Sequence, residues 1–148
     1  PFHLGLIRNS WMERSFIQPN QEKRTLNVRQ KFIPIRQVIE NKKVVLIDDS
    51  LVRGTTSGEI ISMLKSCGAK EVHMRSVSPK IINTCLWGVD IPTREELVSY
   101  KKTDKEIARQ IGADSVKFLP LEKLSEVFMG DVWCKKCFKE DENGIFLP

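Results

Sequence analysis

The chain has 148 residues, of which 41% are hydrophobic and 29% are charged, a balance typical of one soluble globular domain. No apolar run approaches the ~20 residues of a membrane span and no signal-peptide pattern opens the chain, which favours a cytoplasmic location and no membrane partner. The net charge of +5 favours anionic partners, but the lysines and arginines are scattered, without the basic helix typical of nucleic-acid binding. The chain begins with Pro1 rather than Met, so we expect a fragment of a longer protein.

Three parts are expected along the chain. Residues 1–35 form an irregular, polar and basic loop region with isolated aromatic residues. Residues 36–128 carry strand and helix patterns in alternation, which predicts an α/β core. Residues 129–148 form an irregular tail that contains Cys134-x-x-Cys137.

The first strong signal in the core is a run of four apolar residues, Val44 to Ile47. This run is too short for a buried helix, and it predicts a strand that is covered on both faces, as in a parallel sheet. Two carboxylates, Asp48 and Asp49, follow where the strand should end. Ligands of open α/β sheets bind at the carboxyl ends of the strands, so we expect a binding site here.

The loop after the acid pair carries donors and a glycine, namely Ser50, Arg53, Gly54, Thr55 and Thr56. The helix that follows offers N–H groups and a positive dipole end to an anion. Gly54 permits close approach of the backbone, and Arg53 and the hydroxyl groups add donors. Asp48 and Asp49 suit ribose hydroxyls or Mg²⁺. The sequence therefore predicts a sugar-phosphate site, with an ordinary strand–turn–helix and a capping Asp as the alternative; the P-loop pattern is absent.

The next two elements complete a strand–helix–strand unit. Ile60, Leu64 and Cys67 recur at helical spacing, which predicts a helix that buries Cys67 and ends at Gly68. A strand is expected over Glu71–Val77. This order predicts a right-handed unit of two parallel strands.

Two capping-box patterns, at Thr93 and Thr103, predict two further helix starts, with the second helix ending at Gly112. Ser115–Leu119 alternates as a short strand does, and Pro120 suits the first position of a last helix. Further strand and helix patterns thus follow the central unit.

The cysteines allow several interpretations. Cys134-x-x-Cys137 alone is compatible with zinc, iron–sulfur and redox sites. A thioredoxin-like role requires the pair at a helix start after a strand, whereas this pair lies in the tail. Cys85 adds a third thiolate, but tetrahedral zinc sites and 4Fe–4S clusters bind four, and Cys67 is expected to be buried.

The run from Ile47 to Thr56 resembles the phosphoribosyl-pyrophosphate (PRPP) signature of type I phosphoribosyltransferases, in the version found in the amidophosphoribosyltransferase family. The segment from Gly5 to Pro19 resembles that family's flexible loop, which closes over PRPP and helps to form an ammonia channel. The family usually has other residues at four loop positions, here Arg8, Ser10, Trp11 and Glu13. The likeness covers most of the chain and matches the C-terminal part of the family's enzymes.

The resemblance implies the second half of a type I phosphoribosyltransferase fold, in an enzyme that transfers glutamine-derived ammonia to PRPP. Asp48 and Asp49 would hold the ribose hydroxyls and Mg²⁺, and Arg8 and Arg14 would close over the substrate. The 5′-phosphate would be bound by Ser50, Arg53, Gly54, Thr55 and Thr56. The 4Fe–4S cluster of one branch of the family would take three ligands here, Cys85, Cys134 and Cys137, and a fourth upstream of Pro1. Thiols without a metal or with zinc are the alternative.

The implied partners are PRPP, purine nucleotides as competing inhibitors, an upstream glutaminase domain and further copies in a homo-oligomer. The chain alone is expected to be inactive, because the glutaminase domain and the pyrophosphate-binding loop of the family have no counterpart in it. Two other hypotheses stay open. One is a salvage or regulatory phosphoribosyltransferase-like protein that binds PRPP or nucleotides, and the other is an inactive split-gene piece with a structural role.

Overall fold

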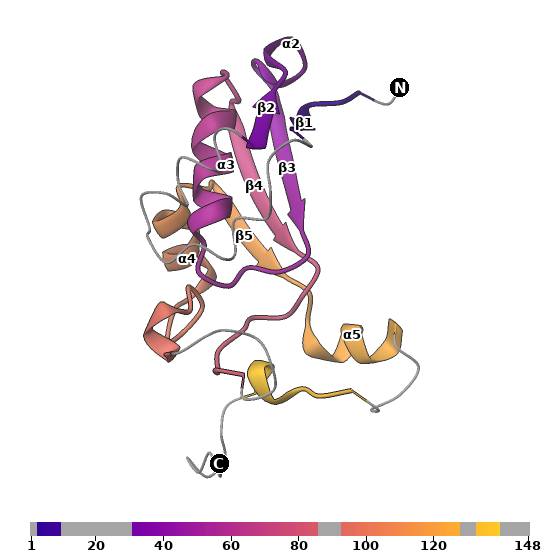
Figure 1. Cartoon of the computed structure of the whole chain (residues 1–148), viewed down its shortest axis with the longest axis vertical. Helices are drawn as coiled ribbons and strands as arrows, with labels where there is room; N and C mark the ends of the chain where they lie inside the picture. The colour runs from indigo at the N-terminus through magenta and orange to yellow at the C-terminus, as the bar shows by residue number, and fades with distance from the viewer. Residues whose placement is uncertain (1–2, 10–30, 86–92, 128–132, 140–148) are drawn as a thin grey trace.

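A computed structural model describes the chain over residues 3–9, 31–85, 93–127 and 133–139. Its centre is a three-stranded parallel sheet, in the order β3 (Lys43–Asp48), β4 (Glu71–Ser76) and β5 (Ser115–Phe118). A separate antiparallel pair consists of β1 (Leu6–Arg8) and β2 (Phe32–Pro34). The predicted α/β fold with a parallel sheet is therefore confirmed (Figure 1).

Two helices lie on one side of the parallel sheet, α3 (Thr55–Ser66) and α4 (Asp104–Ile111) (Figure 1). The other helical segments are short: α2 (Arg36–Ile39), the 3-10 turn η2 (Arg94–Glu96), α5 (Leu121–Val127) and the 3-10 turn η3 (Lys136–Phe138). Within the described ranges, no helix has the length and apolar character that crossing a membrane requires.

The core fills the space between the sheet and the two helices. Val72, Met74 and Val116 point to this side from β4 and β5 and are at most 1% exposed. Ile61 of α3 and Ile107 of α4 meet them in the same cluster. Since neighbouring strand residues point to opposite faces, the same alternation leaves the other face of the sheet outside this core.

The capping box and the glycines in the sequence predicted both ends of α4 and the end of α3 correctly. The hydroxyl oxygen of Thr103 accepts the N–H of Glu106 while the Glu106 carboxylate accepts the N–H of Thr103, which is the capping box predicted for α4. Gly112 ends α4 with φ 74°, and Gly68 follows α3 with φ 89°, as expected for glycines after a helix. The strand predicted over Glu71–Val77 is one residue shorter in the structure.

Four expectations need correction. The loop region predicted over residues 1–35 contains β1 and β2, because two three-residue strands are too short to show a period. The helix predicted after Thr93 is only the 3-10 turn η2, in which Thr93 makes no side-chain cap. The strand expected to be covered on both faces has one open face, with Val45 55% and Ile47 66% exposed. Cys67 is half-buried rather than buried, since it packs at the margin of the core.

Candidate sugar-phosphate site

The acid pair lies at the carboxyl end of the parallel sheet, as predicted. Asp48 is the last residue of β3, and its carbonyl oxygen accepts the N–H of Val77 at 3.0 Å, which ties together the ends of β3 and β4. The Asp48 carboxylate accepts the N–H of Asp49 at 3.0 Å, and the Ser50 hydroxyl donates to the Asp49 carboxylate at 3.1 Å. The pair is thus oriented by its own loop.

The pKa of Asp48 is raised above its ordinary value. Burial is the main cause, since it disfavours the charged form; the hydrogen bond from the Asp49 N–H opposes this, and the negative charge of Asp49 adds to it. A cation between the two carboxylates would offset both the burial and the repulsion. Adjacent carboxylate oxygens are also the ligand type that Mg²⁺ prefers, so the acid pair fits this ion.

The loop between the acid pair and α3 is anchored in the core. Leu51 is only 1% exposed and holds the middle of the loop in the hydrophobic cluster. Gly54 precedes α3 with φ 78°, a left-handed conformation that glycine adopts without strain. The helix therefore begins at Thr55, and its first N–H groups, which in any α-helix lie beyond the internal hydrogen-bond ladder, face the loop.

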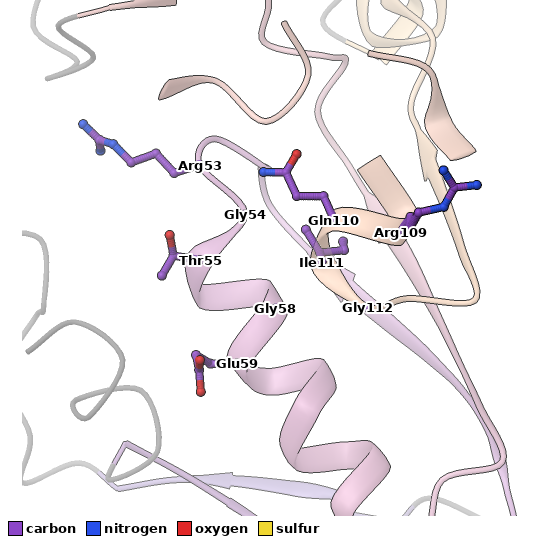
Figure 2. A pocket seen from close by; sticks show the side chains of 9 residues that line it. All are labelled: Arg53, Gly54, Thr55, Gly58, Glu59, Arg109, Gln110, Ile111 and Gly112. Carbon is purple, nitrogen blue, oxygen red and sulfur yellow. The ribbon is translucent and has the colours of Figure 1, made fainter. Parts of the chain in front are cut away.

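A hollow of about 560 Å³ lies beside this loop (Figure 2). It is lined by the loop and the first turns of α3, at Arg53, Gly54, Thr55, Gly58 and Glu59, and by the end of α4, at residues 109–112. Figure 2 shows that the side chains of Arg53 and Arg109 leave the hollow in opposite directions. The hollow is therefore bordered by the backbone and Thr55 at the start of α3 and by the acidic residue Glu59, rather than by two converging guanidinium groups.

The remaining predicted site residues are Arg8, Arg14 and Thr56, and the structure describes only the first and the last of them. Arg8 is the last residue of β1, is exposed and pairs in register with Phe32. Arg14 lies outside the described residues, so its predicted role stays a prediction. Thr56 lies in the first turn of α3 next to Thr55, whereas Ser50, Arg53 and Gly54 lie in the loop before the helix.

The tail segment that contains Cys134 and Cys137 lies beside residues 82–85, which contain Cys85. The carbonyl oxygen of Cys137 accepts the N–H groups of Ile82 at 2.8 Å and Asn83 at 3.1 Å. Burial raises the pKa of Cys137, and the charges of Cys85 and Cys134 raise it further, which places each of these two thiols within electrostatic reach of Cys137. No disulfide involves them. Among the described residues, however, no three His, Cys, Asp or Glu side chains are arranged to hold a metal ion.

Sequence reasoning missed one contact of the loop. Glu96, which the sequence assigned to a helix start, forms an ion pair with Arg53 at 2.7 Å, across 43 residues of sequence. A pattern confined to one segment carries no information about such a distant pairing.

The parallel sheet, the acid pair at its carboxyl edge and the glycine-containing loop that enters α3 together define part of a type I phosphoribosyltransferase fold. Two solved structures superpose on the chain. One is the glutamine PRPP amidotransferase of Bacillus subtilis complexed with ADP and GMP, with a TM-score of 0.74 and 43% identity over 93% of this chain and 32% of that one. The other is described as the allosteric regulatory enzyme of purine biosynthesis, with a TM-score of 0.73 and 40% identity over 98% of this chain and 34% of that one.

Curated sequences agree with the structures. The chloroplastic amidophosphoribosyltransferase of Glycine max is 48% identical over 140 residues, and the amidophosphoribosyltransferase of Methanocaldococcus jannaschii is 47% identical over 137 residues. Each match covers 93% of this chain but only 25% and 29% of the respective relative. No protein-family model matches the chain. The chain is therefore homologous to one segment of the amidophosphoribosyltransferases and spans just over a quarter of their length.

Proposed function

We propose that this chain is the segment of an amidophosphoribosyltransferase that binds the ribose 5-phosphate part of PRPP. One observation carries the proposal: the acid pair at the end of β3 is followed within one short loop by Gly54 and the start of α3. A sugar's hydroxyls and its phosphate therefore find suitable partners on one continuous strand–loop–helix. The identity of 47–48% to named amidophosphoribosyltransferases supports the assignment.

Asp48 and Asp49 would bind the ribose hydroxyls and Mg²⁺. When bound, Mg²⁺ supplies positive charge that stabilises a leaving pyrophosphate. The carboxylates themselves would stabilise the positive charge that develops on the ribose as its bond to pyrophosphate breaks. Binding Mg²⁺ and stabilising the charge on the ribose are two roles that a pair of acids can share, whereas a helix cap needs only one acid.

The loop would bind the 5′-phosphate. The N-terminus of α3 provides N–H groups and a positive dipole end, and Gly54 lets the phosphate approach the backbone. Arg53 and the hydroxyls of Ser50, Thr55 and Thr56 would add charged and neutral donors. Arg8 and Arg14 would close over the substrate from the N-terminal region.

In the longer enzyme, ammonia from glutamine would attack C1 of PRPP, forming the C–N bond of phosphoribosylamine as the C–O bond to pyrophosphate breaks. An upstream glutaminase domain and a homo-oligomeric assembly belong to this proposal. Purine nucleotides carry the same ribose 5-phosphate and would compete for the loop, in keeping with the ADP and GMP in the Bacillus subtilis structure. A salvage or regulatory phosphoribosyltransferase is the second candidate, and the likeness to amidophosphoribosyltransferases over 93% of the chain favours the first.

The first test is calorimetric titration of the chain with ribose 5-phosphate, AMP and PRPP, each in the presence of Mg²⁺. We expect weak binding of all three with similar affinities, because the family's pyrophosphate-binding loop has no counterpart here, and we expect no transfer of ammonia. Absence of ribose 5-phosphate binding would contradict the proposal. A large preference for PRPP, or release of pyrophosphate with ammonia, would show that the chain holds more of the site.

We also propose that Cys85, Cys134 and Cys137 bind a 4Fe–4S cluster together with a fourth thiolate from outside this chain. The proximity of Cys85 and Cys134 to Cys137 supports the proposal, although the described residues do not form a ready ligand set. Because a cluster of this type takes four thiolates, the test belongs in the longer protein. Metal analysis after anaerobic purification should find iron and sulfide; one equivalent of zinc without iron would contradict the cluster.

A further inference from the structure

Arg53 belongs to the loop of residues 50–54, here called the phosphate loop after its proposed role, and is held by a residue that lies far from it in the sequence. Its Nε donates to Oε2 of Glu96 at 2.7 Å, across 43 residues. The two side chains are 26% and 38% exposed, so water screens the pair less than it would a fully exposed one. The contact engages the guanidinium nitrogen next to the aliphatic stem, and it thereby sets the plane in which the terminal amino groups lie.

Glu96 is itself rigidly placed. It ends the turn η2, and the N–H of Leu97 donates to the carbonyl oxygen of Arg94 at 3.0 Å to close that turn. The next two residues, Leu97 and Val98, are each 1% exposed. The closed turn and the two buried side chains thus fix the backbone at Glu96, from which its carboxylate reaches Arg53.

The same segment contacts the loop at two further points. The N–H of Val98 donates to the carbonyl oxygen of Val52 at 2.8 Å. A Cβ built on Gly54 would lie 3.0 Å from a methyl carbon of Val98, so the two backbones pack closely. Residues 94–98, here called the brace, therefore bind three successive loop residues, 52–54, by a backbone hydrogen bond, an ion pair and a packing contact.

We propose that Glu96 is a positioning residue of the sugar-phosphate site. It holds the guanidinium of Arg53 outside the hollow of Figure 2, and the phosphate would contact this guanidinium from the outer side of the loop. This role rests on the proposed function, because it assigns Arg53 to a phosphate. A long arginine side chain loses much rotamer freedom when a ligand immobilises it, and a prior contact removes part of that loss from binding. The negative charge of Glu96 acts in the opposite direction, since it repels an anion. We expect the orienting effect to be the larger of the two, so that loss of Glu96 weakens binding.

The first experiment observes the brace without any ligand. In the ¹⁵N-labelled chain, the Nε–Hε signal of Arg53 is assigned by its loss in Arg53→Lys. We expect this signal to exchange slowly with water and to shift and exchange faster in Glu96→Gln. Glu95→Gln is the matched control, because Glu95 is the exposed neighbour and the change removes the same charge. A signal that Glu96→Gln leaves unchanged would overturn the inference, whatever the chain binds.

The second experiment measures the affinity for ribose 5-phosphate in the presence of Mg²⁺. We expect Glu96→Gln to bind about tenfold more weakly, within the range found for directly coupled residues, and Glu95→Gln to change the affinity less than about twofold. The double variant Arg53→Lys/Glu96→Gln should bind no more weakly than Arg53→Lys alone, because Glu96 acts through Arg53. Glu96→Asp keeps the charge on a shorter stem, and its affinity should lie between those of the wild type and Glu96→Gln.

The outcomes separate the inference from the proposed function. Unchanged or tighter binding by Glu96→Gln, in a wild-type chain that does bind ribose 5-phosphate, overturns the positioning role and leaves the proposed function standing. Additive losses in the double variant overturn it as well, since a merely structural effect of Glu96 would not depend on Arg53. No binding by the wild type contradicts the proposed function itself, and the role of Glu96 in it then falls too. Equal thermal midpoints for the two glutamine variants exclude misfolding as the cause of a difference.

Discussion

Gly54 packs so closely against Ile111 that a Cβ built on the glycine would lie 2.9 Å from Cγ2 of Ile111. The contact joins the phosphate loop to the last residue of α4. Gly54 also has φ 78°, a conformation that other residues adopt only with strain. The loop is therefore held in shape by the packing of α4 as well as by its own backbone, and a change at this glycine should affect both the fold and the site.

Gly54→Ala should destabilise the chain by about 2–4 kcal/mol, because it adds overpacking to a left-handed backbone. Gly112→Ala is the matched control, since Gly112 has φ 74° but a Cβ added there would meet no atom of the described residues within 4 Å. The control should lose only about 1–2 kcal/mol, from backbone strain alone. Urea unfolding measures both variants, and equal losses would show that Ile111 and Val98 move aside without resistance.

In the proposed amidophosphoribosyltransferase that contains this segment, Asp48→Asn and Asp49→Asn should each slow phosphoribosyl transfer on the order of 10²–10³-fold, because each would remove a proposed charge contact to the reacting ribose. Glutamine hydrolysis should persist in part, which provides an internal control for folding. Transfer assays with saturating PRPP and Mg²⁺ make the measurement. Near-normal transfer in either variant would remove the acid pair from the mechanism.

Binding of Mg²⁺ to the acid pair should weaken in mild acid. A proton and the cation compete for Asp48, so affinity falls as the pH decreases through the pKa of this carboxyl group. Because burial raises that pKa, the loss should begin at a higher pH than for an ordinary aspartate. Without the cation, the free energy of unfolding depends on pH in the opposite direction. A raised pKa in the folded state favours folding at low pH, and this contribution is lost as the pH rises through the pKa of Asp48.

The measurement is the rise in thermal midpoint that Mg²⁺ produces, recorded between acid and neutral pH. Asp48→Asn should abolish the pH dependence of that rise along with most of the rise itself. A midpoint shift by Mg²⁺ that is independent of pH in the wild type would speak against cation binding at Asp48.

Self-association of the isolated chain should depend on β3. This strand is at the edge of the three-stranded sheet, and its outward side chains Val45 and Ile47 are exposed. Exposed apolar edge strands pair with other chains, and a lysine on such a strand opposes this. Val45→Lys should therefore lower the fraction of dimers and larger species in sedimentation experiments. Ile33→Lys is the control, since Ile33 is similarly exposed, at 54%, but lies in the hairpin; an equal effect of both variants would indicate charge alone.

Short-range chemistry explains what could be predicted from the sequence. The run from Val44 to Asp49 predicts a strand with acids at its end, because burial and the position of the strand end are properties of consecutive residues. The capping box at Thr103 and the glycine at 112 set the limits of α4 for the same reason. The strand–loop–helix from Asp48 to Thr56 was predictable since all of its members are consecutive in the sequence, and its binding of a sugar phosphate stays a prediction.

Only the tertiary structure decided which distant residues meet this loop. Nothing in the local pattern of Arg94–Glu96 distinguishes a helix start from a turn that presents Glu96 to Arg53. The open face of β3 was also beyond a local pattern, because an apolar run shows that burial is favourable but not which element provides it. The sequence by itself thus determined the strand, the acids at its end and the loop that enters α3. The fold decided how Arg53 is oriented, because that depends on contacts between segments that are brought together only when the core is packed.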